Sequence, residues 1–358
     1  MNLRLEKRQK ATQIHQIAAI LFAFLCALGV SGLLIASAGV DIRDALTAFG
    51  RGAFGNQRAI AETLVHTTPL ILTGLATVVA FRAKVWNIGA EGQLVAGAMA
   101  ATWVSLHVAS LPTLLHALLV FLVAMAAGSL WGGIAGLLKA RYQADEIIVT
   151  IMMNFVITYL LSYLLANQWR DPTGFYQQTA ALPVQAHLPL LITPSRLHSG
   201  FAVALLAAII VHILLTQTVL GYEIRVMGLN AVAARYKGID VVRTMLLVML
   251  ISGGLAGLAG GIEVAGLHHR LRLDIASGLG FTGIIIALLG RLNALGVILA
   301  ALFFGVLTSG IVTMQITAGV PAALVNAIQG IVLIFLLIAD ALARYRIVWR
   351  SFHEGHHD

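Results

Sequence analysis

Long runs of apolar residues alternate with short polar segments along the whole chain. Most of the runs are close to the roughly 20 residues that a helix needs to cross a bilayer. Their apolar residues are continuous rather than alternating with polar ones, which favours helices over the strands of a closed barrel. The pattern therefore predicts an all-α integral membrane protein with about ten transmembrane helices, at residues 15–38, 62–81, 92–110, 114–138, 147–166, 200–219, 243–263, 279–290, 294–312 and 321–341.

Two of these runs need a separate interpretation. The run 279–290 is short for a full crossing, so we expect it to be tilted, broken or partly re-entrant. The first run follows a basic segment, as a signal peptide would. It is longer than the apolar core of about 7–15 residues that is typical of signal peptides, so we expect a retained membrane anchor.

The basic residues predict the orientation, because cytosolic segments of membrane proteins carry an excess of Lys and Arg. With a cytosolic N-terminus, the cytosolic segments hold sixteen of the 23 basic residues: Arg4, Lys7, Arg8, Lys10, Arg82, Lys84, Lys139, Arg141, Arg225, Arg235, Lys237, Arg243, Arg291, Arg344, Arg346 and Arg350. The external segments hold seven: Arg43, Arg51, Arg58, Arg170, Arg196, Arg270 and Arg272. We therefore expect both termini in the cytosol.

This topology divides the chain into a cytosolic N-terminal segment (1–14), a transmembrane permease domain (15–341) and a cytosolic tail (342–358). Within the domain, an external loop spans 167–199 and a more charged cytosolic segment spans 220–242. Glycines recur every fourth residue in two runs, which lets helices approach closely. We expect this spacing to serve packing within one bundle rather than a dimer seam. The glycines are Gly128, Gly132 and Gly136, and Gly253, Gly257 and Gly261.

Composition agrees with a membrane protein. Hydrophobic residues make up 59% of the chain and charged residues 11%, against roughly 25% charged in an average soluble domain. A soluble protein could not cover that much apolar surface. The net charge of +8 is explained by basic cytosolic loops rather than by nucleic acid binding. The single cysteine, Cys26, excludes an intrachain disulfide.

The cytosolic segment 220–242 contains the signals for two short helices. Asn230 is a good N-cap for a helix over Ala231 to Tyr236, and Gly238 is a good stop. A second short turn runs over 222–227. On composition alone, the basic residues of this segment could simply be a positive-inside anchor.

The same segment resembles the coupling-helix segment of ABC importer permeases in the nucleoside and simple-sugar branch of the branched-chain amino acid/ribose-type permease family. The matching positions are Gly221, Arg225, Gly228, Asn230, Ala233, Ala234, Arg235, Tyr236, Gly238 and Ile239. The family usually has Pro two residues after the Asn, where this chain has Val232. That departure affects where the short helix starts.

Two further blocks resemble the same branch. Residues 87–93 read Asn-Ile-Gly-Ala-Glu-Gly-Gln, which is similar to a signature of its nucleoside permeases. Residues 145–154 read Asp-Glu-Ile-Ile-Val-Thr-Ile-Met-Met-Asn, which is similar to a third segment of these permeases. The three blocks occur in the family's order, and with the hydropathy the resemblance covers about residues 60–340.

The resemblance implies a non-catalytic permease subunit that translocates nucleosides, or simple sugars, by alternating access. It implies these partners: separate ABC ATPase subunits, a second related permease in a heterodimer, and an extracytoplasmic substrate-binding protein or lipoprotein. It implies a multi-pass protein of the bacterial plasma (inner) membrane, with no cofactor of its own, because ATP is bound by the partners. The residues implied in ATPase coupling are Gly221, Arg225, Gly228, Asn230, Ala234, Arg235, Tyr236 and Gly238.

Four polar residues are candidates for the substrate path. Asn87, Glu91 and Gln93 lie beside glycines where a span begins or breaks, and Asn154 lies inside the fifth run. A broken helix exposes backbone groups that a polar ligand can use, and a charge at mid-bilayer costs about 2.5–3.5 kcal/mol on insertion scales. Two structural alternatives stay open for Glu91: it lies in water at the interface, or it pairs with Arg82 or Lys84.

Other functions have weaker signals. No lysine is followed by Ser or Thr, so the chain has no phosphate-binding loop of the Gly-Lys-Ser/Thr type. An ion-gradient-driven secondary transporter with Glu62, Glu91 or Glu263 as a proton relay is the alternative, but no inverted repeat indicates one. Residues 353–357 read His-Glu-Gly-His-His at the extreme terminus, with a glycine inside, and we predict neither a metal site nor a catalytic site there.

Overall fold

The computed structural model describes residues 2–7, 13–108 and 111–350. Within these residues the chain forms thirteen α-helices, and six helical segments are long and apolar enough to cross a membrane. The six are α3 (Gln57–Arg82), α5 (Thr113–Tyr142), α6 (Glu146–Ala166), α7 (Gly200–Gln217), α10 (Val241–Ile262) with its π-helical continuation η2 (Glu263–His268), and α12 (Ala294–Thr317). The hydropathy prediction of a helical, multi-pass membrane protein is confirmed. Ten crossings with cytosolic termini stay a prediction.

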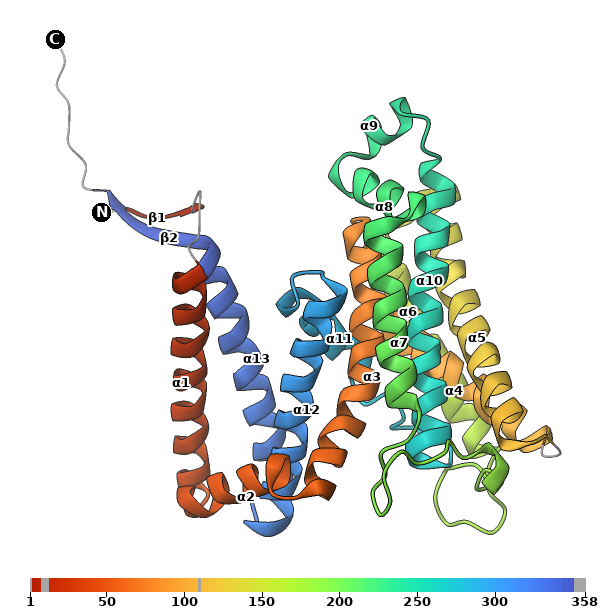
Figure 1. Ribbon diagram of the computed structural model, residues 1–358, viewed down its shortest axis with the longest axis horizontal. Helices are drawn as coiled ribbons and strands as arrows, with labels where there is room; N and C mark the ends of the chain where they lie inside the picture. Colours follow the sequence, from red (N-terminus) through yellow and green to blue (C-terminus); the bar gives the residue numbers. More distant parts are fainter. Residues whose placement is uncertain (1, 8–12, 109–110, 351–358) are drawn as a thin grey trace. The chain divides into compact units, whose positions relative to one another are not determined.

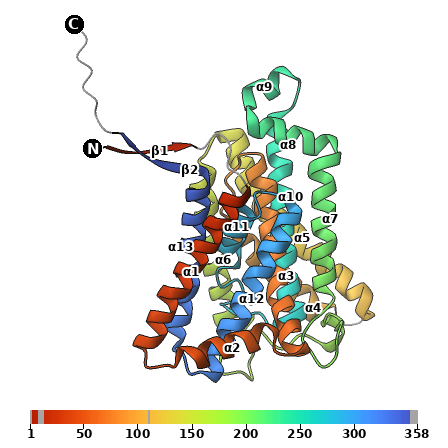
Figure 2. The ribbon, with the colours of Figure 1, turned by 60° about the vertical axis from the view of Figure 1, so that its left-hand side comes forward.

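The chain folds into two compact units, one from residues 1–52 and 310–358 and the other from residues 53–309. In the first unit, α1 (Gln13–Ser37) packs against α13 (Ala322–Arg344), and both views show these helices side by side (Figure 1 and Figure 2). Strands β1 (Asn2–Lys7) and β2 (Tyr345–Arg350) form an antiparallel pair in which Asn2 lies opposite Arg350. Backbone hydrogen bonds therefore join two segments that lie far apart in the sequence.

Helix α2 (Ile42–Phe54) is an element that the hydropathy pattern did not predict. The Asp41 carboxylate caps its start by accepting the Arg43 N–H at 2.7 Å. Ala45 is fully buried, while Ile42 and Leu46 are exposed on another side of the helix. α2 is therefore an amphipathic helix in the connection that follows α1.

The second unit has α3 at its centre, because nearly every side chain of this helix from Ala61 to Phe81 is buried. Its buried polar residues are threonines, whose hydroxyl groups donate to backbone carbonyls, mostly four residues earlier. Thr67 donates to Thr63 at 2.7 Å and Thr77 donates to Thr73 at 3.1 Å. This local bonding satisfies the hydroxyl groups without a partner helix.

The two glycine runs pack against each other inside this unit. A methyl group added at Gly128 of α5 would overlap the carbonyl oxygen of Gly253 and the backbone of Gly257 on α10. The backbones of the two helices therefore touch, which no residue with a side chain would permit. The prediction that these glycines serve packing within one bundle is confirmed.

Helix α11 (Leu279–Leu289) has only 11 residues. It is about 17 Å long and cannot cross a hydrocarbon core of about 30 Å. Gly283 lies against Thr73, near the middle of α3, and the Leu292 carbonyl accepts a hydrogen bond from Arg82 at the end of α3. The run at 279–290 is thus a broken crossing that starts halfway along α3, as its length led us to expect.

The loop 167–199, predicted to be external, folds back onto neighbouring segments of the second unit. It contains the short 3-10 helix η1 (Val184–Ala186) and a bridge between Gln178 and Arg272. Asp171 forms an ion pair with Arg270 at 2.8 Å. Hydrogen bonds to its carboxylate lower the pKa of Asp171 to about 2. The hydroxyl and backbone N–H of Thr173 contribute most, and Arg270 contributes less. The loop is therefore held by specific polar contacts.

Candidate functional site

The sharp turn between α3 and α4 (Ala90–His107) is built around the buried side chain of Asn87. Its Nδ2 donates to Ser252 Oγ at 2.8 Å and to Gln93 Oε1 at 3.0 Å, and its Oδ1 accepts the Gly89 N–H at 2.9 Å. The Ser252 hydroxyl in turn donates to the Ala76 carbonyl at 2.7 Å. Asn87 therefore ties the start of α4 to both α10 and α3.

Asn154 of α6 holds the same turn from another side. Its Oδ1 accepts the Gly92 N–H at 2.9 Å, and its Nδ2 donates to the Ile88 carbonyl at 3.0 Å. The Ile88 N–H donates to the Thr150 hydroxyl at 3.3 Å. The first N–H groups of a helix lack partners within it. The blocks 87–93 and 145–154 thus meet in space. Side chains of the second block are hydrogen-bond partners for backbone groups of the first.

Glu91 lies in the first turn of α4, and its carboxylate caps another helix. Oε1 accepts the Gly278 N–H and Oε2 accepts the Gly280 N–H, both at 2.7 Å. These groups form the N-terminus of α11, where the helix dipole favours a negative charge. A methyl group at Gly280 would overlap the Glu91 backbone, so the two helix starts touch.

These contacts change the picture of Glu91 that the sequence allowed. Its oxygens bind backbone N–H groups rather than Arg82 or Lys84, and Arg82 Nε instead donates to the Leu292 carbonyl at 2.7 Å. The alternative that Glu91 pairs with Arg82 or Lys84 is therefore wrong.

The four residues predicted for the substrate path come together in one cluster, which we call the helix-break cluster: Asn87, Glu91, Gln93 and Asn154 with Thr150, Ser252, Gly278 and Gly280. Asn87 and Gln93 are each 1% exposed and Asn154 is 6% exposed. Their polar groups are used in internal hydrogen bonds, so the observed arrangement fixes two helix starts. Contact with substrate stays a prediction.

Four members of this cluster were not predicted from the sequence. Ser252 sits in a Ser-Gly-Gly triplet within an otherwise apolar run, and that isolated hydroxyl was a usable signal. Gly278 and Gly280 lie just before or inside the short run 279–290, which signalled a break but not its partner. Their hydrogen bonds to Glu91 join residues 187 and 189 positions away.

The segment 220–242, predicted to be cytosolic, forms the two short helices expected from the sequence, α8 (Val219–Leu229) and α9 (Ala231–Tyr236). The Asn230 side chain caps α9 by accepting the N–H groups of Val232 and Ala233 at 2.9 and 3.1 Å. Gly238 has a φ of +79° and ends the helix. Figure 1 places α8 and α9 beyond the ends of α7 and α10, at one extremity of the second unit.

Most of the α9 surface is uncovered. Ala234 is fully buried and anchors the helix, whereas Tyr236 is 89% exposed and Arg235 is also exposed. Leu229 and Val232 are exposed apolar residues of the same segment. An exposed apolar surface with basic neighbours is typical of a site for a partner protein.

Helix α8 is seated against α3 and α7 through glycines. A methyl group at Gly228 would overlap the carbonyl oxygen of Arg82, and one at Gly221 would overlap that of Leu214. Only glycine allows the two backbones to approach this closely. The predicted coupling segment is therefore in backbone contact with the end of α3.

The remaining candidate groups lie elsewhere. Glu62 forms an ion pair with Arg196 at 2.6 Å, and Glu263 lies 3.4 Å from His268. In the part of the chain that the structure describes, no group of three or more His, Cys, Asp or Glu side chains could hold a metal ion. The His-Glu-Gly-His-His sequence at 353–357 lies outside the described residues.

Comparison with known proteins follows this geometry. The family described as branched-chain amino acid transport system / permease component matches residues 59–337. The glucose ABC transporter permease protein TsgB13 of Haloferax volcanii is 38% identical over 97% of this chain and 94% of its own length. The guanosine ABC transporter permease protein NupP of Bacillus subtilis is 39% identical over 92% and 95%.

Another relative also comes from Bacillus subtilis. The guanosine ABC transporter permease protein NupQ of Bacillus subtilis is 30% identical over 69% of this chain and 79% of its own length. No solved structure matches this chain.

Proposed function

We propose that this chain, which belongs to the family of branched-chain amino acid transport system permease components, moves nucleosides across a membrane as one permease of an ABC importer. As an ABC transporter permease it is not an enzyme, and family membership implies ATPase and binding-protein partners. It also excludes the ion-gradient-driven secondary transporter, because import by this family is coupled to ATP.

The observation that carries the nucleoside proposal is the block at 87–93. It resembles the signature of nucleoside permeases, and its side chains organise the helix-break cluster. Two relatives named for guanosine support it. A relative named for glucose favours a simple sugar as the second candidate, and a nucleoside itself contains a sugar.

The coupling that we propose runs from the cytosolic segment to the helix-break cluster through backbone contacts. Movement of α9 would carry α8, and Gly228 of α8 rests on the last carbonyls of α3. Arg82 joins that end of α3 to the turn after α11, and the start of α11 is held by Glu91. Alternating access needs a bistable element of this kind, which both sites can bias.

We further propose the assembly. The coupling residues of α8 and α9 would contact ATPase subunits, which bind the ATP, so this chain needs no cofactor. A second, related permease would complete the translocation path, as the pair of guanosine permeases in Bacillus subtilis suggests. A substrate-binding protein or lipoprotein would deliver substrate at the outer face of a bacterial inner membrane.

Uptake measurements test this proposal. Cells that express the complete transporter should accumulate labelled guanosine, and excess unlabelled nucleosides should compete while glucose should not. Depleting ATP should abolish uptake, whereas collapsing the ion gradient with ATP maintained should not. Glucose accumulation without guanosine accumulation would replace the nucleoside by a sugar and leave the permease assignment intact.

A further inference from the structure

A cavity of about 530 Å³ lies in the first unit and is lined by residues of that unit alone. Its volume falls in the range of small-molecule sites, about 300–1,000 Å³. One wall is a single face of α2, with residues at helical spacing. The others are the turn after α1 and the end of α12. Its lining residues are Gly39, Val40, Asp41, Asp44, Thr47, Ala48, Arg51, Thr313, Thr317 and Ala318.

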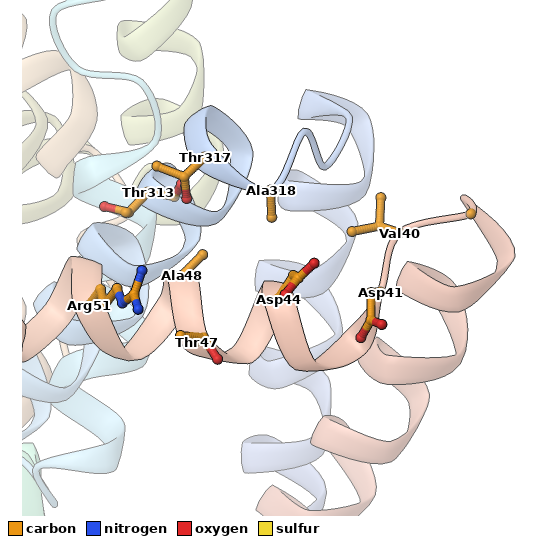
Figure 3. A pocket seen from close by; sticks show the side chains of 10 residues that line it. Val40, Asp41, Asp44, Thr47, Ala48, Arg51, Thr313, Thr317 and Ala318 are labelled. Atoms are coloured by element: carbon orange, nitrogen blue, oxygen red, sulfur yellow. The ribbon is translucent and has the colours of Figure 1, made fainter.

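The charges of this cavity are separated. Figure 3 shows Asp41 and Asp44 toward one end, and Arg51 at the other end beside Thr313 and Thr317 of α12. Asp44 and Arg51 are seven residues apart on α2, or about 10 Å along the helix axis. That distance is too long for a direct ion pair, and neither side chain has a hydrogen-bond or ion-pair partner among the residues that the structure describes.

The helix dipole accounts for part of this pattern. An acid in the first turn and a base in the last turn each stabilise α2. The helix dipole does not explain why Asp41, Asp44, Arg51 and the threonines all line one cavity. The shape and the charge separation together fit a ligand that carries a cation at one end and an anion at the other.

The location of the cavity limits which ligands can reach it. It lies where α1 ends at Ser37 and where the apolar segment of α12 ends at Ala318, which is one surface of the membrane. Leu33 and Ile316, near these ends, are 72% and 76% exposed, as lipid-facing side chains are. Ile42 and Leu46 give α2 an exposed apolar side, which is typical of helices in the headgroup region.

We propose that this cavity binds an ammonium–phosphate zwitterion, namely the phosphoethanolamine group of a membrane lipid. The primary ammonium has three N–H donors for the carboxylates of Asp41 and Asp44. Arg51 matches two phosphate oxygens in a bidentate, charge-assisted pair. The two-carbon ethanolamine link, with one hydrogen bond at each end, reaches across the distance between these groups. In a free α-amino acid one carbon separates the charges, which is too short.

Native mass spectrometry of the full-length chain in its assembled transporter tests the site. The complex is released from nanodiscs that hold equal amounts of phosphatidylethanolamine, phosphatidylcholine and phosphatidylglycerol. We expect phosphatidylethanolamine to be retained preferentially, because the choline headgroup has no N–H donors and the glycerol headgroup has no cation. Equal retention of the three lipids would overturn the proposal.

Variants locate the preference in the cavity. Arg51→Gln and Asp44→Asn should each lower phosphatidylethanolamine retention by about tenfold, the effect of losing one charge-assisted hydrogen bond. Arg43→Gln is the matched control, because Arg43 lies on the same helix and does not line the cavity. Unchanged retention in both cavity variants, or an equal loss in the control, would reject the site.

A competition experiment distinguishes the lipid headgroup from free phosphoethanolamine as the ligand. Free O-phosphoethanolamine that displaces the lipid, where glycine does not, would make the soluble zwitterion a sufficient ligand. Retained lipid in its presence would assign the cavity to the membrane-embedded form. Displacement by glycine at the same concentration would contradict the charge spacing on which the proposal rests.

Discussion

The helix-break cluster and the segment that forms α9 look alike in the sequence, since both are short polar motifs with glycines between apolar runs. Their structures differ. In the cluster, Asn87 and Gln93 are almost fully buried and bond to each other and to backbone groups. In α9 only Ala234 is buried and Tyr236 is almost entirely exposed. The polar groups of the first motif find their partners within the chain, whereas the second motif presents a surface that the described residues leave uncovered.

This contrast separates two reasons for which a polar motif exists. Buried polar groups without partners are costly, so a motif inside a bundle must satisfy its own hydrogen bonds before it can do anything else. A motif on the surface has water as an alternative partner and is free to present apolar side chains to another protein. Changes in the first region should therefore reduce stability, and changes in the second should reduce association.

The largest effect is expected for Glu91→Ala. It removes the acceptor of two N–H groups at the start of α11, and each unsatisfied group costs about 1–3 kcal/mol. We expect the free energy of unfolding to fall by about 2–6 kcal/mol, measured by thermal unfolding in detergent. Glu91→Gln keeps one acceptor oxygen and should lose less. If the Ala variant has normal stability but transports poorly, Glu91 contacts substrate rather than stabilising the fold.

Gly228→Ala should have the next largest effect. The added methyl group overlaps the Arg82 carbonyl and pushes α8 away from α3, at a cost of about 1–3 kcal/mol. Uptake should fall sharply while ATP hydrolysis by the complex continues.

Gly238→Asn is the control for Gly228→Ala. The space around Gly238 is open, and Asn tolerates its positive φ. Equal uptake by both variants would break the proposed link between α8 and α3.

Tyr236→Ala sharpens the comparison from the other side. Because this side chain is 89% exposed, its removal should change the free energy of unfolding by no more than about 0.5 kcal/mol. The ATPase subunit should co-purify about tenfold less, as expected for an exposed tyrosine at an interface. Arg235→Glu should likewise uncouple transport without affecting membrane insertion. Phe175→Ala, at another exposed aromatic residue in the loop 167–199, is the control, and a similar loss there would contradict a specific role for α9.

The smallest effect concerns the loop 167–199, whose Asp171 has partners within the chain, as the polar groups of the helix-break cluster do. The folded-state pKa of Asp171 is lowered to about 2, so the stability from its contacts is present above the usual pKa of about 4. It is lost as the pH falls from about 4 to about 2. Hydrogen exchange at 167–199 should rise over that interval. Asp171→Asn should remove this step, and an unchanged step would assign the pH dependence to another group.

The sequence predicted helical crossings well, because a long apolar run has few alternatives in a bilayer. It also predicted α9, since the Asn230 cap and the Gly238 stop act within a few residues. α2 was missed because its residues are only moderately apolar. The exposed pair Ile42 and Leu46 at helical spacing, after a capping Asp41, was an available signal.

The candidate site was harder to predict because its contacts are distant in sequence. The motif at 87–93 identified a place where a helix breaks, but the partner of Glu91 lies on a helix that begins nearly 190 residues later. Both hydrogen bonds go to backbone groups, which leave no side-chain signature. Local patterns can show that a carboxylate needs a partner, and only tertiary structure shows which.

The shortness of α11 has a mechanical consequence. An unbroken membrane-crossing helix can be displaced only as a whole rod, against the packing along its full length. α11 instead ends in separate joints, one at the Glu91 carboxylate and one beside Arg82. Because α11 has only 11 residues and separate contacts at its two ends, we expect it to tilt more readily than the longer helices around it.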